Sequence, residues 1–256
     1  HEVTTEPLVS ASGALVVEAG NDGYLGRMTA TVHNSDPPEF HWDILPVTAD
    51  IAEDPAVAAL VDAARAPFLD RPVNFDYPMP NTDMPLVETI DVPISKSPVL
   101  LNRRGVLTNS FNQFLADEIR NYYHTDVALT PGFRFDAVVP QGDPITLENL
   151  YRYLPVPATL AKGNITGRNL RALFEKELSS AFSADAFQHE GGWFLGISGL
   201  DLQVDLDRAD GQRVVSMRRA TDQTEVLMNE VLSVASCVRP FDNPGVLCSG
   251  EGFTEV

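Results

Sequence analysis

Two short segments that contain arginine are the residues best suited to chemistry in this sequence. Arg103-Arg104-Gly105 stands shortly before a predicted helix, and Pro131-Gly132-Phe133-Arg134 follows a predicted buried strand. An arginine side chain can donate to two oxygens of one oxyanion, a helix N-terminus adds backbone N–H donors, and a glycine lets a ligand approach the backbone closely. These segments predict a binding site for an anionic substrate. A solvated turn or a structural ion pair is the alternative interpretation of the arginine pair.

Two segments that contain histidine are weaker candidates. His189-Glu190-Gly191-Gly192-Trp193 places two glycines before two aromatic residues, which suits a loop that lines a cleft, and a tight turn with its aromatic side chains in the core is the alternative. His1-Glu2 begins the sequence without a methionine, so on its own we interpret it as a processing, cloning or proteolysis boundary. The five histidines show no close pairing of the kind found in a helical zinc motif.

The sequence has two cysteines, Cys237 and Cys248. A pair at this spacing can close a short loop as a disulfide, which fits an oxidising compartment. Two free thiols are the alternative. A zinc site is disfavoured, because tetrahedral zinc needs about four ligands and the nearest histidine, His189, is far away in sequence.

Composition and missing motifs exclude several classes of function. The sequence has no Gly-x-Ser-x-Gly elbow, no Walker-type phosphate loop and no dinucleotide fingerprint. Its 18 basic and 36 acidic residues give a net charge of −18, which repels phosphate backbones and argues against binding of nucleic acid. No apolar run is long enough to predict a membrane span. An anion site on such an acidic chain must therefore be built locally.

Capping residues and apolar spacing predict four helices. They begin after Asp54, at Ser110, after Thr146 and after Thr166, and Pro67 should end the first of them. Alternation or short apolar runs predict these strands: 14–17, 27–32, 126–129, 200–206, 213–217 and 231–235. Because strands and helices are mixed without a regular alternation, we expect an α/β (α+β) fold with a mixed β-sheet flanked by helices. Residues 71–98 contain six prolines and predict an extended connector.

The first of two family resemblances concerns the N-terminal strands. Leu15–Gly20 followed by Gly23–Arg27 resembles the end of the metallophosphoesterase domain of 5′-nucleotidases, where this run directly follows a Gly-His-x-His metal motif. The resemblance implies that His1 is a metal ligand, the last histidine of that motif. It also implies that the N-terminal strands are the remnant of a catalytic domain of which most is missing from this chain.

The second resemblance covers most of the remaining chain. The segments 126–134, 142–146, 154–155 and 165–170 together resemble the C-terminal domain of 5′-nucleotidases. The family implies a hydrolase with two divalent metal ions, manganese or zinc, mostly bound outside this chain in an N-terminal metallophosphoesterase domain that is the partner of this one. We therefore expect a catalytic-domain tail at 1–47, a linker helix and connector at 48–85, and a substrate-recognition domain at 86–256.

Within this family, two segments are similar to the sulfur-oxidation thiosulfohydrolase branch, SoxB. These are Leu100–Gly105 and Leu129–Phe135. Nucleotidases usually carry Asn-x-Gly-Gly-Ile-Arg at the second place, and two phenylalanines that sandwich the base. Here Val156 follows Leu154-Pro155, and the second phenylalanine position falls near Gly245. Without these aromatic faces a purine loses stacking worth about 1 kcal/mol or more per face, which argues against adenine specificity.

The resemblance implies the substrate-recognition portion of a SoxB-like thiosulfohydrolase, with no catalytic residue in this chain. Its substrate-binding residues would be Arg103, Arg104, Arg134, Gly132, Phe133, Gly191 and Gly192. The expected ligand is a small anion or a thiosulfonate bound to a carrier protein, in the periplasm or outside the cell. A nucleotide phosphohydrolase domain and a non-catalytic periplasmic binding module are the alternatives.

Overall fold

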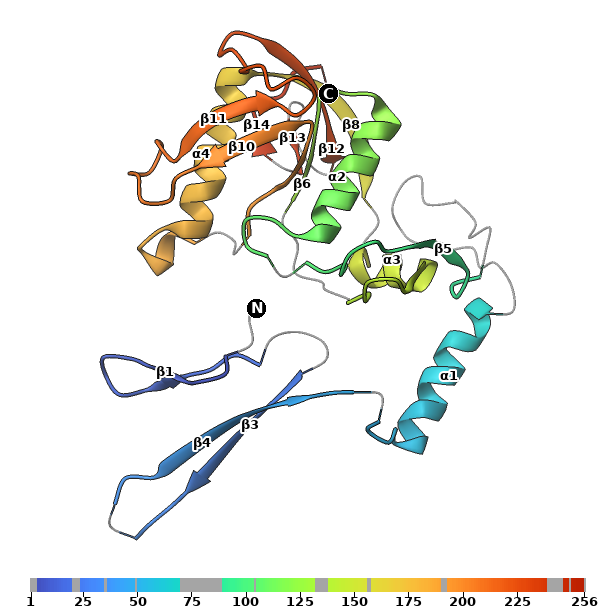
Figure 1. The fold of residues 1–256 in the computed structure, drawn as a ribbon, viewed down its shortest axis with the longest axis vertical. Helices are drawn as coiled ribbons and strands as arrows, with labels where there is room; N and C mark the ends of the chain where they lie inside the picture. The colour runs from blue at the N-terminus through green and yellow to red at the C-terminus, as the bar shows by residue number, and fades with distance from the viewer. Residues whose placement is uncertain are drawn as a thin grey trace.

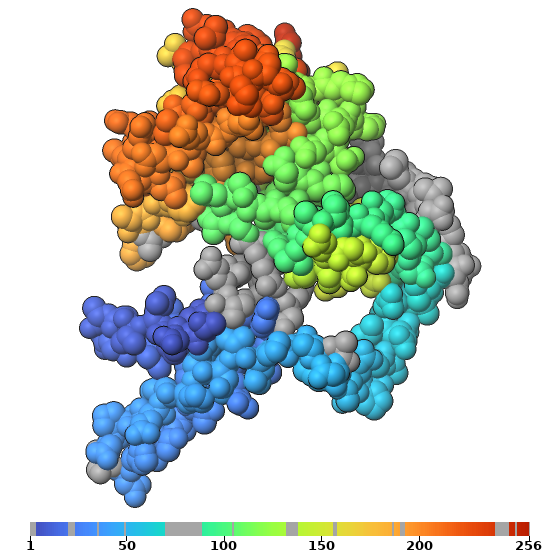
Figure 2. Space-filling model, in the orientation of Figure 1, coloured from blue at the N-terminus to red at the C-terminus, as the bar shows by residue number. Residues whose placement is uncertain are grey.

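The computed structural model describes residues 4–19, 24–34, 36–48, 50–69, 89–103, 105–131, 138–155, 158–189, 193–238, 246–248 and 250–255. Figure 1 shows two N-terminal hairpins that lie apart from a larger C-terminal body, with one helix, α1, between them in the chain. In the space-filling view an open gap separates the hairpins from that body on the left side (Figure 2).

The N-terminal region consists of two antiparallel hairpins. Strands β1 (Leu8–Val9) and β2 (Leu15–Val16) form the first, and β3 (Tyr24–Thr31) and β4 (Glu39–Pro46) form the second. The partner strand β4 was not predicted, although Glu39–Ile44 alternates polar and apolar residues. Apolar side chains of this region are exposed, among them Leu25 at 59% and Phe40 at 53%. Two-stranded hairpins of this kind need a further packing layer to be stable.

Helix α1 (Pro55–Leu69) begins as predicted, because the Asp54 carboxylate accepts the backbone N–H groups of Ala56 and Val57. The prediction that Pro67 ends it is wrong, since the helix continues to Leu69. Proline removes only its own N–H, and so close to the C-terminus of a helix the lost bond is tolerated. None of the described α1 residues is buried.

An ion pair and a backbone hydrogen bond connect α1 to the C-terminal body. The Arg65 guanidinium donates to both carboxylate oxygens of Glu148, at 3.1 and 2.7 Å. The N–H of Ile90 donates to the Phe68 carbonyl at 3.2 Å. Both side chains of the ion pair are about one-third exposed, so solvent screens their attraction.

The predicted mixed sheet is confirmed at the centre of the C-terminal body. Its strands are β6 (Val127–Thr130), β8 (Thr159–Thr166), β9 (Gly196–Ser198) and β12 (Val231–Val238), in the order β8-β12-β6-β9. The central pair β12 and β6 is parallel, whereas β8 and β9 each run antiparallel to their neighbour.

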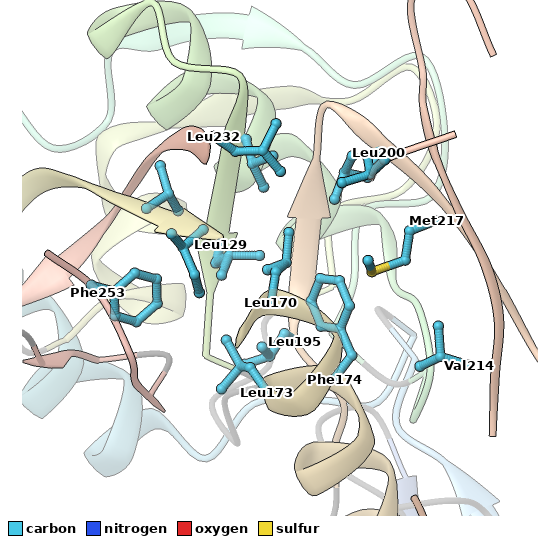
Figure 3. Packing of buried hydrophobic residues seen from close by; sticks show 14 of the residues in the cluster. Leu129, Leu170, Leu173, Phe174, Leu195, Leu200, Val214, Met217, Leu232 and Phe253 are labelled. Carbon is cyan, nitrogen blue, oxygen red and sulfur yellow. The ribbon is translucent and has the colours of Figure 1, made fainter. Parts of the chain in front are cut away.

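Helices α2 (Ser110–Tyr123) and α4 (Gly167–Phe182) flank the sheet on opposite faces. Alternation along β6 assigns Val127 and Leu129 to the α4 side and Ala128 to the α2 side. The α4 side holds the larger core (Figure 3), to which the helix contributes Leu170, Leu173, Phe174 and Leu178. The Thr166 side chain caps α4 by accepting the N–H of Asn169, as predicted.

Shorter elements complete the body. Strand β5 (Pro93–Lys96) pairs with β7 (Pro144–Thr146), so the extended connector predicted over 71–98 is wrong at its end. The predicted Thr146 cap of α3 (Leu147–Tyr153) is confirmed as a capping box with Asn149. The rest are η1 (Ala186–Gln188), the hairpin of β10 (Leu200–Val204) with β11 (Val214–Arg219), and the hairpin of β13 (Val246–Leu247) with β14 (Gly250–Glu251). None of the helices described is long and apolar enough to cross a bilayer.

Candidate functional site

Four strand ends meet on one side of the central sheet, beyond the carboxyl ends of its parallel strands β6 and β12. We call this side the sheet edge. Because β6 and β12 are parallel, both end at this edge, at Thr130 and Val238. The antiparallel strands β8 and β9 begin there, since Thr159 pairs with Val238 and Gly196 pairs with Thr130. In open α/β sheets ligands bind outside the carboxyl ends of parallel strands. This edge is therefore where the fold favours a binding site.

The predicted ligand-binding residues attach to this edge in the chain. Gly132, Phe133 and Arg134 come directly after the end of β6, and Gly191 and Gly192 come shortly before β9. All five lie outside the described residues, so their roles stay predictions. What the structure adds is that two segments about 60 residues apart in sequence join the sheet at paired positions, Thr130 and Gly196.

Arg103 is placed among core side chains. It is 3% exposed, its Nη1 donates to the Tyr153 carbonyl at 3.0 Å, and its guanidinium lies 4.6 Å from the centre of the Phe111 ring. The rings of Phe111 and Tyr153 stack in turn at 3.8 Å. These contacts tie the segment before α2 to α3 and give Arg103 a packing role. Arg104 lies outside the described residues, and substrate binding by either arginine stays a prediction.

The N-terminal turn of α2 is capped within the chain. Asn109, one residue before the predicted Ser110, is the N-cap, and its Oδ1 accepts the N–H of Asn112 at 2.8 Å. The N–H of Phe111 donates to the Asn102 carbonyl at 3.0 Å. The Ser110 hydroxyl instead donates to the Leu100 carbonyl. These backbone donors are thus engaged within the chain, and the predicted anion site at this helix start stays a prediction.

Two buried polar side chains at this edge were not anticipated from the sequence. Thr130 is 1% exposed and Asn112 is 2% exposed, and neither the Thr130 Oγ1 nor the Asn112 Oδ1 has a hydrogen-bond partner within the described structure. Gly196 lies against both, because a Cβ added there would be 2.6 Å from the Thr130 Oγ1 and 2.8 Å from the Asn112 Cβ. No sequence signal separates these residues from ordinary strand and helix positions, since their burial depends on tertiary packing.

Cys237 and Cys248 form a disulfide, in agreement with the sequence interpretation. The N–H of Cys248 also donates to the Cys237 carbonyl at 2.7 Å. Cys237 lies next to the end of β12, and Leu247 beside the second cysteine is fully buried. The disulfide therefore fixes the chain that leaves the sheet at this edge.

The described residues contain no group of three or more His, Cys, Asp or Glu side chains that could hold a metal ion. His1, the implied ligand, lies outside them. His189 is placed by a 2.7 Å contact between its Nε2 and the Ser183 carbonyl.

At the other end of the sheet, where β6 and β12 begin, charged side chains form a network that holds neighbouring strands together. Burial raises the pKa of the Asp126 carboxyl, but hydrogen bonds from the Ser233 N–H and hydroxyl, together with the Arg219 guanidinium, stabilise the carboxylate and lower that pKa below its usual value. Arg219 also pairs with Glu230, which raises the Arg219 pKa and lowers that of Glu230. The network joins β6, β11 and β12 near the starts of β6 and β12.

Comparison with known proteins identifies the family. The family model described as "5′-nucleotidase, C-terminal domain" matches residues 89–237, which is more than half of the chain. The chain belongs to the 5′-nucleotidase C-terminal domain family. The match spans the central sheet, both flanking helices and the segments that carry the predicted arginines. None of the curated proteins matches the chain.

Solved structures share this fold. The chain is similar to the sulfate thiohydrolase SoxB of Thermus thermophilus in complex with glycerol, with a TM-score of 0.75, 21% identity, and coverage of 95% of this chain and 43% of that one. It is also similar to a 5′-nucleotidase precursor from the same species, with a TM-score of 0.62, 21% identity, and coverage of 91% and 44%. The chain thus spans less than half the length of either protein. Both are hydrolases by name.

Proposed function

We propose that this chain is the substrate-recognition portion of a dinuclear-metal hydrolase of the SoxB-like thiosulfohydrolase type. The observation that carries the proposal is the meeting of four strand ends at one sheet edge, to which the Gly132–Arg134 segment and the Gly191-Gly192 segment both attach. Arg104 and Arg134, helped by Arg103, would hold the anionic end of the substrate.

The proposal assigns metal binding and substrate recognition to two different domains. The described residues offer no metal site, so we assign the pair of divalent metal ions, manganese or zinc, to the N-terminal metallophosphoesterase domain. When bound, that pair would activate the attacking water. We assign residues 1–47 to the tail of that domain, 48–85 to the linker and 86–256 to recognition. The exposed apolar side chains of β1–β4 support this division, because hairpins with such surfaces need a covering layer.

The nature of the substrate is part of the proposal. Val156 stands where nucleotidases carry a base-stacking phenylalanine, which favours a sulfur-containing anion, free or bound to a carrier protein, over a nucleotide. A periplasmic or extracellular location is proposed on the basis of the disulfide between Cys237 and Cys248.

The experiment is a thermal-shift panel on the intact two-domain protein with manganese, in which AMP, phosphate, sulfate and thiosulfate are compared. We expect thiosulfate and sulfate to raise the melting temperature. Stabilisation by AMP alone would overturn the thiosulfohydrolase assignment in favour of a nucleotidase. Metal-dependent turnover by the purified 256-residue chain would contradict the assignment of catalysis to the N-terminal domain.

A further inference from the structure

Phe187 is an aromatic side chain that the protein leaves almost entirely in solvent. It lies in η1, shortly after α4, and it is 97% exposed, the largest value among the large apolar side chains of the described residues. Burial of an aromatic ring stabilises a folded chain, and this ring gains none of that stabilisation within the chain. Single exposed apolar residues are common on proteins, so the placement of Phe187 decides what its exposure means.

Hydrogen bonds fix the backbone on both sides of Phe187. The Asp185 carboxylate accepts the N–H of Phe187 at 3.0 Å, and the Asp185 carbonyl accepts the N–H of Gln188 at 3.0 Å. The His189 Nε2 donates to the Ser183 carbonyl at 2.7 Å and closes the segment from its other end. The ring is thus presented from an ordered backbone, so a group that packs on it need not order the chain first.

The direction of α4 places Phe187 on the side of the sheet edge. Strand β8 starts at the sheet edge and ends at Thr166, at the other end of the sheet. Helix α4 then runs back over the main core, and in Figure 1 its last turn points toward the N-terminal hairpins. This end of α4 borders the open gap in Figure 2. Phe187 stands between it and Gly196, where the chain enters β9 at the sheet edge.

A backbone hydrogen bond brings the segment of the arginine pair to the same place. The N–H of Phe194 donates to the Val106 carbonyl at 2.7 Å. The chain that enters β9 therefore lies against the chain that follows Arg104, and the chain that leaves β6 toward Arg134 starts beside both. The segments to which we assign anion binding thus converge on the side of the body where Phe187 is exposed.

We propose that Phe187 is a specificity-determining residue, which packs on an aryl or alkyl group joined to the anion that is bound at the sheet edge. This inference rests on the proposed function, because that function supplies the anion. Thiosulfate itself has no apolar part that could contact the ring. An organic thiosulfate ester offers its sulfonate to the arginines and its organic group to Phe187. The residue would therefore favour esters with a large apolar group.

The experiment is a calorimetric titration of the full 256-residue chain with S-benzyl thiosulfate and S-methyl thiosulfate. Both esters are monoanions with the same sulfonate group, so they differ only in the size of the apolar part. We expect the parent to bind the benzyl ester about threefold to tenfold more tightly than the methyl ester. Phe187→Ala should bind the two esters equally. An S-sulfonated Gly-Cys-Gly peptide represents a polar polypeptide source of the anion, and it should bind to both proteins as the methyl ester does.

Two further variants serve as controls. Tyr122→Ala removes another aromatic side chain, which is 76% exposed near the end of α2, at the other end of the sheet. It should keep the preference for the benzyl ester. Phe187→Leu retains an apolar side chain and should keep part of that preference. Because Phe187 is almost fully exposed, Phe187→Ala should leave the urea midpoint of unfolding unchanged, so lost binding cannot be ascribed to a lost fold.

Several results would overturn the inference. They are equal affinity of the parent for the two esters, an unchanged preference in Phe187→Ala, an equal loss in Tyr122→Ala, or a Phe187-dependent gain for the polar peptide. Titration with thiosulfate tests the proposed function separately. If thiosulfate binds and the two esters do not differ, the role of Phe187 fails and the anion site stands. If neither thiosulfate nor any ester binds, the proposed function fails and this inference fails with it.

Discussion

Glu175 offers the sharpest test of how the recognition domain is held together. This residue of α4 is 7% exposed, and its two carboxylate oxygens accept the N–H of Val214 at 2.7 Å and the N–H of Arg213 at 2.9 Å. The Arg213 guanidinium in turn donates to the Leu178 carbonyl near the end of α4. The carboxylate thereby joins the helix to the start of β11. Both bonds are buried and charge-assisted.

The perturbation is Glu175→Gln, which keeps the shape of the side chain and one acceptor oxygen. Its amide NH₂ group then faces one of the two N–H groups, of Val214 or Arg213, that the carboxylate had accepted. One charge-assisted bond is lost and one buried N–H is left without a partner, so we expect a loss of about 2–4 kcal/mol in the free energy of unfolding. At about 2–4 °C per kcal/mol for a chain of this size, the melting temperature should fall by roughly 5–15 °C. Glu175→Met removes both acceptors and should cost more.

The assay is urea denaturation followed by circular dichroism, with Glu118→Gln on the exposed side of α2 as the control. The control should change stability by less than about 0.5 kcal/mol. The reasoning is refuted if Glu175→Gln costs no more than the control, or if Glu175→Met is the less destabilising of the two Glu175 variants.

Two further predictions concern stability. Asp126→Asn should cost about 1 kcal/mol at neutral pH, a modest figure because the carboxylate is 40% exposed. Folding lowers the Asp126 pKa, so the stability lost in Asp126→Asn should have its full size above the ordinary aspartate pKa of 3.8. It should vanish as the pH falls through the lowered pKa. A loss that does not change with pH in a denaturation series would contradict this prediction. Replacing Cys237 and Cys248 together by serine should cost about 2–3 kcal/mol, measured as the shift in the urea midpoint. An unchanged midpoint would contradict a stabilising role of the disulfide.

Local signals predicted much of the secondary structure. Asp54, Thr146 and Thr166 cap helices as predicted, because a cap depends on residues within one turn of it. The Ser110 cap is displaced by one residue to Asn109, since tertiary contacts direct the Ser110 hydroxyl to Leu100. Strand β4 and the pairing of β5 with β7 were missed, because pairing between distant segments leaves little trace in either segment alone.

The candidate site combines predictions from the sequence with the topology of the sheet. The sequence indicates which segments carry the arginines and glycines, but the edge to which they attach depends on the parallel pairing of β6 with β12. Arg103 shows the limit most clearly. Its neighbours in sequence suggest an anion ligand, whereas its contacts with Phe111 and Tyr153 come from residues that only the fold brings together.

Calorimetric titration of thiosulfate into the Arg134→Gln variant tests the central claim most directly. If the sheet edge recognises the anion through Arg134, the dissociation constant should rise about tenfold or more relative to the parent chain. Arg218→Gln is the control, because this arginine of β11 is about half exposed and pairs only loosely with Glu225. It should bind thiosulfate as the parent does. Equal weakening by both substitutions, or tighter binding of AMP than of thiosulfate by the parent, would contradict the account.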